Sequence, residues 1–320
     1  MRKHSVLVLL CGFSMFFAAQ GCASLSGGQM KAVDSFAASC DSFSKFPGGF
    51  FEEMARLRVE RGLYFSASLS DPQLRVEEIN SVYSSLVKDL QLSKKTNLSL
   101  EILTSYQRAL KVLSGKGRWQ DAGREMRSLG RSLDSLVLRF NALGVLEQAL
   151  PIGIGKSAGK LAGYTAEIFV KRAQSRAVKQ FVIEGDTLIN ALVENLVKVL
   201  RTPAVTALIE NEKRGLEQNY ITYLRSAGNR AGDAGNRPSG YREDREYMAL
   251  KERVEKLATV RGGVISASNR LAKAHSKLAS EFTKRKKLDE LYTELLDFEK
   301  EVTNLQKEVK NVVDKWPYSN

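Results

Sequence analysis

The fold is decided by residues 250–282, LKERVEKLATVRGGVISASNRLAKAHSKLASEF. Apolar side chains recur in this stretch at alternating spacings of four and three residues, which place them on one face of a helix. Between Arg261 and His275 every seventh position is polar, although the spacing does not change. The positions on this face are Leu250, Val254, Leu257, Arg261, Val264, Ser268, Leu271, His275, Leu278 and Phe282. So regular a pattern predicts long helices that pack at shallow angles in a bundle or coiled coil.

Two further stretches carry the same pattern, residues 119–143 and residues 291–316, the second in a different phase. Spacings of three replace the alternation just before residue 291, which predicts a local overwinding or kink. This irregular point carries the basic cluster Lys284, Arg285, Lys286 and Lys287. No alternating apolar run long enough for a strand occurs, and the 320 residues include only 6 prolines. The sequence therefore predicts an all-α protein, an elongated helical bundle with long coiled-coil-like helices.

The chain opens with a secretory signal over residues 1–21. A pair of basic residues is followed by an apolar run too short for a typical membrane span, and a small residue precedes Cys22. The segment that ends at Cys22 resembles the lipobox of bacterial lipoproteins, although Ala19 stands where leucine is commonest and Gln20 is bulky for its place. The resemblance implies cleavage after Gly21, diacylation of Cys22 and a mature protein tethered to a membrane.

The resemblance also bears on location. Ala23 follows the cysteine instead of an aspartate, so the enterobacterial sorting rule, if it applies, places the protein in the outer membrane of a bacterial cell envelope. The alternative is an ordinary cleaved signal that leaves Cys22 unmodified. In that case a bridge from Cys22 to Cys40 becomes conceivable, whereas lipidation leaves Cys40 as the one free cysteine of the mature chain.

The mature chain divides at changes of composition. We expect a lipidated tether over residues 22–46, a helical bundle over 47–225, a flexible loop rich in glycine, asparagine and arginine over 226–241, and long C-terminal helices over 242–317 that pack on the bundle. Within the bundle, aspartate or threonine followed by proline predicts helix starts at Asp71-Pro72 and Thr202-Pro203. The polar stretch Ser93–Asn97 predicts a break between two helices.

Charge gives a first indication of partners. The formal net charge is +13, and removal of the two basic residues of the signal, which contains no acidic residue, leaves +11. This excess favours anionic neighbours such as lipid headgroups or an anionic envelope polymer. Nucleic acid is not expected, because the chain is exported.

The sequence contains no strong motif for catalysis, metal binding or phosphate binding. The mature chain has one histidine, His275, and a metal site or a catalytic triad needs several convergent groups, so a structural or pH-sensing role is the better interpretation. Gly155-Lys156-Ser157 lacks the earlier glycine of a phosphate-binding loop, because that position is Leu150. Glu52 and Glu53 are adjacent, so their side chains point in different directions on a helix, and we expect them to lie on a solvated face. We expect no catalytic site, no metal and no cofactor.

Residues 143–170 are unusual because glycine recurs within a segment of helical spacing. One interpretation is a turn around Pro151 followed by a tightly packed helix, since small residues let backbones approach closely. The other is a membrane-inserting amphipathic segment with Lys156 and Lys160 on its polar side.

The leading functional prediction is a non-enzymatic, membrane-anchored lipoprotein that acts as an interaction or scaffold module through its helical surfaces and positive charge. Its partners would be a membrane, reached by the lipid anchor and by the basic cluster 284–287, and a protein or an anionic envelope polymer; the heptads also allow self-association. The alternative is a membrane-inserting or pore-forming protein that uses residues 143–170. An enzyme acting on wall glycan ranks third.

Overall fold

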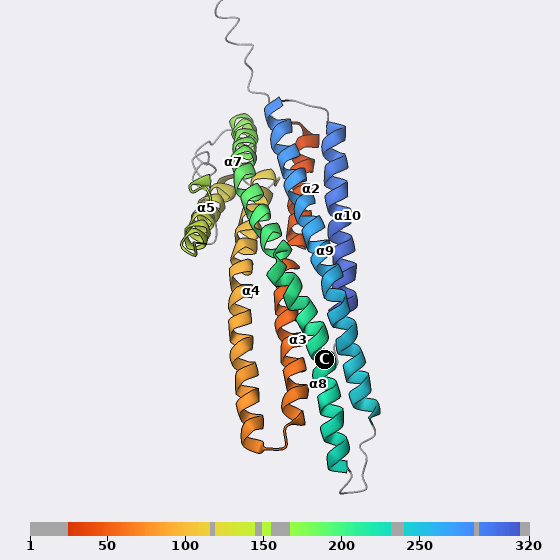
Figure 1. Cartoon of the computed structure of the whole chain (residues 1–320). Helices are drawn as coiled ribbons and strands as arrows, with labels where there is room; N and C mark the ends of the chain where they lie inside the picture. Colours follow the sequence, from red (N-terminus) through yellow and green to blue (C-terminus); the bar gives the residue numbers. More distant parts are fainter. Residues whose placement is uncertain are drawn as a thin grey trace, which may run out of the picture.

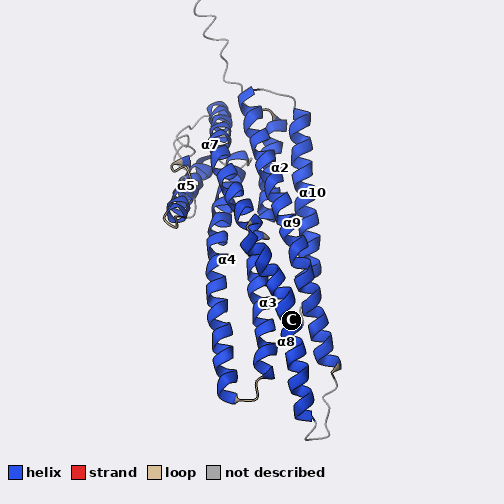
Figure 2. Ribbon diagram, viewed as in Figure 1, coloured by secondary structure: helices blue, strands red, loops and turns tan. Residues whose placement is uncertain are grey.

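The computed structural model of the chain describes residues 25–115, 119–144, 149–154, 167–231, 240–284 and 288–313. These residues form eight helices and no strand, so the predicted all-α class is confirmed (Figure 2). The helices are α2 (Gly27–Phe43), α3 (Pro47–Ser68), α4 (Pro72–Ser114), α5 (Trp119–Asn141), α7 (Glu167–Arg201), α8 (Pro203–Ala231), α9 (Tyr241–Lys284) and α10 (Leu288–Val313).

The predicted helix starts are confirmed. The Asp71 side chain accepts hydrogen bonds from the backbone N–H groups of Gln73 and Leu74, and Pro72 occupies the first turn of α4, where a missing N–H is harmless. Thr202 caps α8 in the same way, through Val205. The predicted break at residues 93–97 is wrong, because α4 continues through it to Ser114. That stretch contains neither glycine nor proline, and Leu98 and Ile102 beyond it are buried.

The predicted tether is wrong over residues 27–43, because they form α2. Ser26 and Gln29 close a reciprocal capping box at its start. The helix buries one face, and Phe36 and Cys40 are almost inaccessible to solvent. The other buried members of this face are Ala32, Val33, Ala37 and Phe43. Their spacing of three and four residues is helical, but small residues between them mask the pattern.

Figure 1 shows the long helices lying side by side around α9. This helix contacts α7, α10, α3, α8 and α2, while α5 packs on α4. One continuous hydrophobic core includes residues from all eight helices. The two C-terminal helices thus lie against helices from the earlier part of the chain, α9 against α7, α3, α8 and α2, and α10 against α2. The loop predicted over 226–241 is shorter than expected: α8 extends to Ala231, α9 begins at Tyr241, and residues 232–239 lie outside the described part of the chain.

The heptad face of α9 is the inner face of that helix. Its apolar members from Leu250 to Phe282 are buried, and the polar members Ser268 and His275 are fully buried as well. Ser268 satisfies its hydroxyl by donating to the carbonyl oxygen of Val264 at 2.6 Å. Arg261 instead reaches the surface, where its guanidinium donates to the Thr206 hydroxyl at 2.7 Å. The periodicity thus identified the inner face, including the positions where that face is polar.

Candidate functional site

Most of the predicted site residues fall outside the described residues. These are Cys22, Lys156, Lys160, Arg285, Lys286 and Lys287; Lys284 is described only as the last residue of α9. The structure does describe the ends of the helices that come before and after these segments. The Tyr292 hydroxyl on α10 donates to the carbonyl oxygen of Gly28 on α2 at 3.0 Å, so both helices begin at one end of the bundle. Figure 1 shows the end of α9 and the start of α7 at this same end.

The start of the glycine-rich segment is folded against α5. The Asn141 side chain accepts from the backbone N–H of Leu150 at 2.8 Å and donates to its carbonyl oxygen at 3.0 Å. The backbone N–H of Gly153, a residue with a φ of 97°, donates to the Asp134 carboxylate at 3.1 Å. Leu150 and Ile154 are buried. Residues 149–154 therefore match the turn around Pro151, while the glycines at 155, 159 and 163 lie outside the described residues.

A buried polar network surrounds His275 and joins three helices. Its Nδ1 lies 2.9 Å from Oδ1 of Asp186 on α7, and its Nε2 lies 2.8 Å from the hydroxyl of Tyr106 on α4. The Ser276 hydroxyl also donates to Asp186 Oδ1 at 2.9 Å and accepts from the Asn190 amide at 3.0 Å. The Tyr106 ring stacks on Phe181, with centroids 4.7 Å apart.

The protonation states in this network follow from burial. Burial lowers the pKa of His275 below its usual 6.5, only partly opposed by the hydrogen bond and charge of Asp186. Burial would raise the pKa of Asp186, but hydrogen bonds from His275 and Ser276 keep it below 3.8. Burial also raises the pKa of the Tyr106 hydroxyl. His275 and Tyr106 have no accessible surface, so this aspartate–histidine–tyrosine arrangement is closed to a substrate and serves to hold α4, α7 and α9 together.

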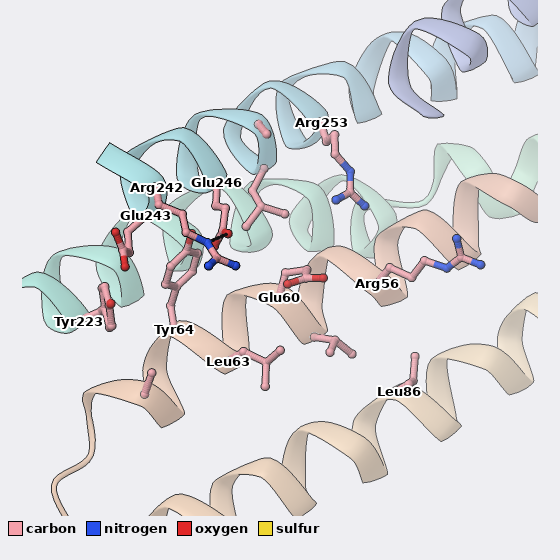
Figure 3. Close-up of a pocket in the computed structure, with 14 residues that line it drawn as sticks. Arg56, Glu60, Leu63, Tyr64, Leu86, Tyr223, Arg242, Glu243, Glu246 and Arg253 are labelled. Carbon is pink, nitrogen blue, oxygen red and sulfur yellow. Dashed lines mark hydrogen bonds and ion pairs between the residues drawn. The ribbon is translucent and has the colours of Figure 1, made fainter. Parts of the chain in front are cut away.

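The solvent-accessible candidate site is a pocket of about 580 Å³ in the half of the bundle away from the start of α2. Figure 3 shows α3 along its floor, with α9 on one side and α4 on the other. Aliphatic side chains and two tyrosines supply most of its lining, and charged residues stand along it. The lining residues are Arg56, Val59, Glu60, Leu63, Tyr64, Ala67, Leu86, Tyr223, Arg242, Glu243, Glu246, Ala249, Leu250 and Arg253.

The pocket's charged groups differ in how they are paired. Arg253 forms a buried ion pair with Glu53 at 2.7 Å, so the expectation that Glu53 lies on a solvated face is wrong. Arg242 pairs with Glu246 at 3.1 Å on the same helix. The Tyr64 hydroxyl oxygen and Oε2 of Glu243 are buried and have no hydrogen-bond partner among the described residues. Burial is also the main reason that the pKa of Glu60 is raised. Buried polar atoms without partners are rare in folded proteins, and they are candidates for contact with a ligand or water.

Beside the pocket, one face of α4 is apolar and uncovered. Val76, Ile79, Tyr83 and Val87 follow one another at spacings of three and four residues, and each is between 38% and 65% exposed. They share this side of the helix with Leu86, which lines the pocket. We call Val76, Ile79, Tyr83 and Val87 the α4 row. Exposed apolar rows of this kind mark interaction sites in many proteins.

No family model, curated protein or solved structure matches this chain. The site must therefore be interpreted from its own geometry. Within the described part of the chain, no group of three or more histidine, cysteine, aspartate or glutamate side chains could hold a metal ion. None of the described helices is both long and apolar enough to cross a membrane.

Sequence reasoning missed both the pocket and the partners of His275. The apolar spacing through Ile79, Val82 and Leu86 identified a helical face, and Val82 indeed lies against Gly62 of α3. Nothing in the local pattern indicates that the same face is left partly uncovered, because that depends on how far α9 stands from α4. His275 was singled out, but Asp186 and Tyr106 lie 89 and 169 residues away along the chain.

Proposed function

We propose that this protein is a non-enzymatic lipoprotein of the bacterial cell envelope, anchored through Cys22, which holds a binding surface for a protein partner away from the membrane. The α4 row is the observation that carries the proposal. The helical body would act as an interaction or scaffold module, and its positive charge would add contacts to anionic lipid.

The row fits an amphipathic helix of the partner. From Val76 to Val87 it extends about 16 Å along α4, or three helical turns at 1.5 Å per residue. In this half of the bundle α4 packs on α3, and Val82 is the side chain that meets Gly62 across that contact. The side chains of the α4 row lie beside the face that packs on α3, next to the pocket. A helix with apolar residues at spacings of three and four could cover the row and complete the packing around α3.

Anchoring is supported by the placement of the helix ends. Gly28, close to the start of α2, is hydrogen-bonded to Tyr292, and Cys22 lies six residues before it. α9 ends at Lys284 and α10 begins at Leu288, and the sequence has the basic cluster 284–287 between them. Lysine and arginine near a membrane surface are each worth about 1 kcal/mol of attraction to anionic lipid. Diacylation of Cys22 together with the basic cluster would meet the requirement of at least two signals for stable anchoring.

Site-specific photo-crosslinking in intact envelopes tests the proposal. A photo-reactive amino acid in place of Tyr83 should give a discrete adduct with one protein, whereas the same group in place of the exposed Glu101, on the other half of α4, should not. Val87→Glu, combined with the crosslinker at position 83, should remove the adduct, because it places a charge within the row. Absence of a discrete adduct at position 83, or equal adducts at both positions, would contradict the proposal.

The anchor has a separate test. Cys22→Ser removes the thiol that carries the lipid, so cells fed an alkyne fatty acid should label the parent protein and not this variant. Absence of label on the parent protein, or equal label on both, would contradict lipidation of Cys22. The alternative function, membrane insertion by residues 143–170, stays a prediction: Leu150 and Gly153 are hydrogen-bonded to α5, which gives it no support.

A further inference from the structure

We propose that the pocket between α3, α4 and α9 binds an organic cation with an apolar body, an alkylammonium compound, whose charged end lies beside Tyr64, Glu243 and Glu246. This site goes beyond the partner surface on α4 and does not depend on it. The geometry of the pocket provides for each part of such a ligand.

The apolar body would lie along aliphatic side chains from three helices. Val59 and Leu63 come from α3, Leu86 from α4, and Ala249 and Leu250 from α9. From Arg56 to Ala67 the floor helix rises about 16 Å, which accommodates an alkyl chain of six or more carbons. The volume of about 580 Å³ lies in the range of small-molecule sites, which are mostly apolar with a few polar groups that fix orientation.

The charged end of the ligand would meet an excess of carboxylates. Glu60, Glu243 and Glu246 stand around Tyr64, and Arg242 is the guanidinium beside them in Figure 3, where Arg56 and Arg253 lie toward the other end. Arg253 is held by Glu53 and Arg242 by Glu246. Burial is the main cause of the raised pKa of the Tyr64 hydroxyl, and the charges of Glu246 and Glu60 add to it. The carboxylates around Tyr64 favour a cation over an anion.

Aromatic rings complete the cation-binding end. Tyr64 and Tyr223 are 5.7 Å apart between ring centroids and are inclined at 56°, and Tyr64 also packs edge-to-face against Tyr220, so tyrosine rings gather at this end of the pocket. An ammonium group within about 6 Å of the face of a tyrosine ring is attracted by the ring quadrupole, and aromatic side chains recognise quaternary ammonium ligands in other proteins. The unpaired Tyr64 hydroxyl oxygen and Oε2 of Glu243 supply polar atoms at the same end.

Three probes that share one alkyl chain test the proposal: hexyltrimethylammonium, hexanesulfonate and hexanol. Each is titrated calorimetrically into the full mature chain in nanodiscs of zwitterionic lipid, with empty nanodiscs as the blank. We expect saturable binding of one hexyltrimethylammonium per chain, and at least tenfold weaker binding of the other two. Glu243→Gln should weaken binding of the cation about three- to tenfold, because it neutralises a carboxylate at the binding end.

Glu255→Gln is the matched control, because Glu255 is on α9 but pairs at the surface with Lys213, outside the pocket. It should leave binding unchanged. Tyr64→Phe provides a second variant that keeps the ring but removes the buried hydroxyl. The proposal is overturned if hexyltrimethylammonium shows no saturable binding, if hexanesulfonate or hexanol binds equally well, or if Glu243→Gln binds the cation as tightly as Glu255→Gln does.

Discussion

Gly185 lies on α7 directly beneath the buried ring of Tyr106. A Cβ atom built on this glycine would come closer than 3.0 Å to the Tyr106 hydroxyl and to two of its ring carbons. The ring cannot move away easily, because it stacks on Phe181 and its hydroxyl is hydrogen-bonded to His275. We therefore predict that Gly185→Ala destabilises the protein, although alanine is the better helix former.

The magnitude follows from three opposing effects. Replacing a helical glycine by alanine stabilises a helix by about 1 kcal/mol. Overpacking a buried site costs about 1–3 kcal/mol, and losing the hydrogen bond between Tyr106 and His275 costs about 1 kcal/mol more. The net loss is about 2 kcal/mol, which lowers Tm by about 4–8 °C in a protein of this size. Gly262 on α9 is a matched control, because a Cβ there has no neighbour within 4 Å.

The measurement is thermal and urea unfolding of the two variants and the parent protein, followed by far-ultraviolet circular dichroism. Gly262→Ala should raise the free energy of unfolding by up to about 1 kcal/mol, and Gly185→Ala should lower it. If Gly185→Ala is as stable as Gly262→Ala, the packing described for Tyr106, and with it the network around His275, is wrong.

Two further predictions concern buried charge. Arg253→Met should lower the free energy of unfolding in urea by about 3–5 kcal/mol, because it leaves the buried Glu53 carboxylate without its 2.7 Å partner. Adding Glu53→Gln should restore much of that loss. Equal stability of the single and double variants would refute this prediction. Stability should also fall as the pH drops below about 6.5, since the unfolded chain binds a proton at His275 before the folded chain does. The slope is at most about 1.4 kcal/mol per pH unit. The free energy of unfolding, measured in urea between pH 7 and 5.5, should depend less steeply on pH in His275→Gln than in the parent protein. Equal pH dependence in the two proteins would argue against a neutral buried histidine.

How much of this could be predicted from the sequence depends on the range of the interactions. Caps and heptads are local: Asp71-Pro72 starts a helix because the aspartate binds backbone groups two and three residues ahead. The heptad line even included His275 and Ser268, which are buried. The sequence predicts a tether where α2 lies, because alanine, serine and glycine separate the few large side chains of this helix. The core contacts of Phe36 with His275 and Phe298 become apparent only in three dimensions.

The candidate site could not be predicted from the sequence for a related reason. A pocket is formed by the distance between helices, and Glu60, Leu86 and Glu243 belong to three helices that are far apart in the chain. Each of these residues, taken alone, resembles an ordinary surface or core position. Neither the uncovered α4 row nor the unpaired hydroxyl of Tyr64 has a sequence signature, because both follow from what the neighbouring helices leave open.

In the proposed anchoring, one end of the bundle meets the membrane, and the pocket and the α4 row are held away from it. Single cysteines placed at Asp289, beside the start of α10, and at Ser70, in the turn between α3 and α4, report on the two ends. Both positions are exposed, whereas Cys40 is buried and has a raised pKa, mainly because of burial and secondly because of Asp41, so it should react slowly with a maleimide dye.

The measurement is energy transfer from each dye to acceptors at the surface of vesicles that carry the lipidated protein. The 43 residues of α4 span about 64 Å, so the two ends differ widely in height if the bundle stands on the membrane. We predict strong transfer from position 289 and little from position 70. Equal transfer from both positions would show that the bundle lies flat, and strong transfer from position 70 alone would show that it is inverted; either result contradicts the account.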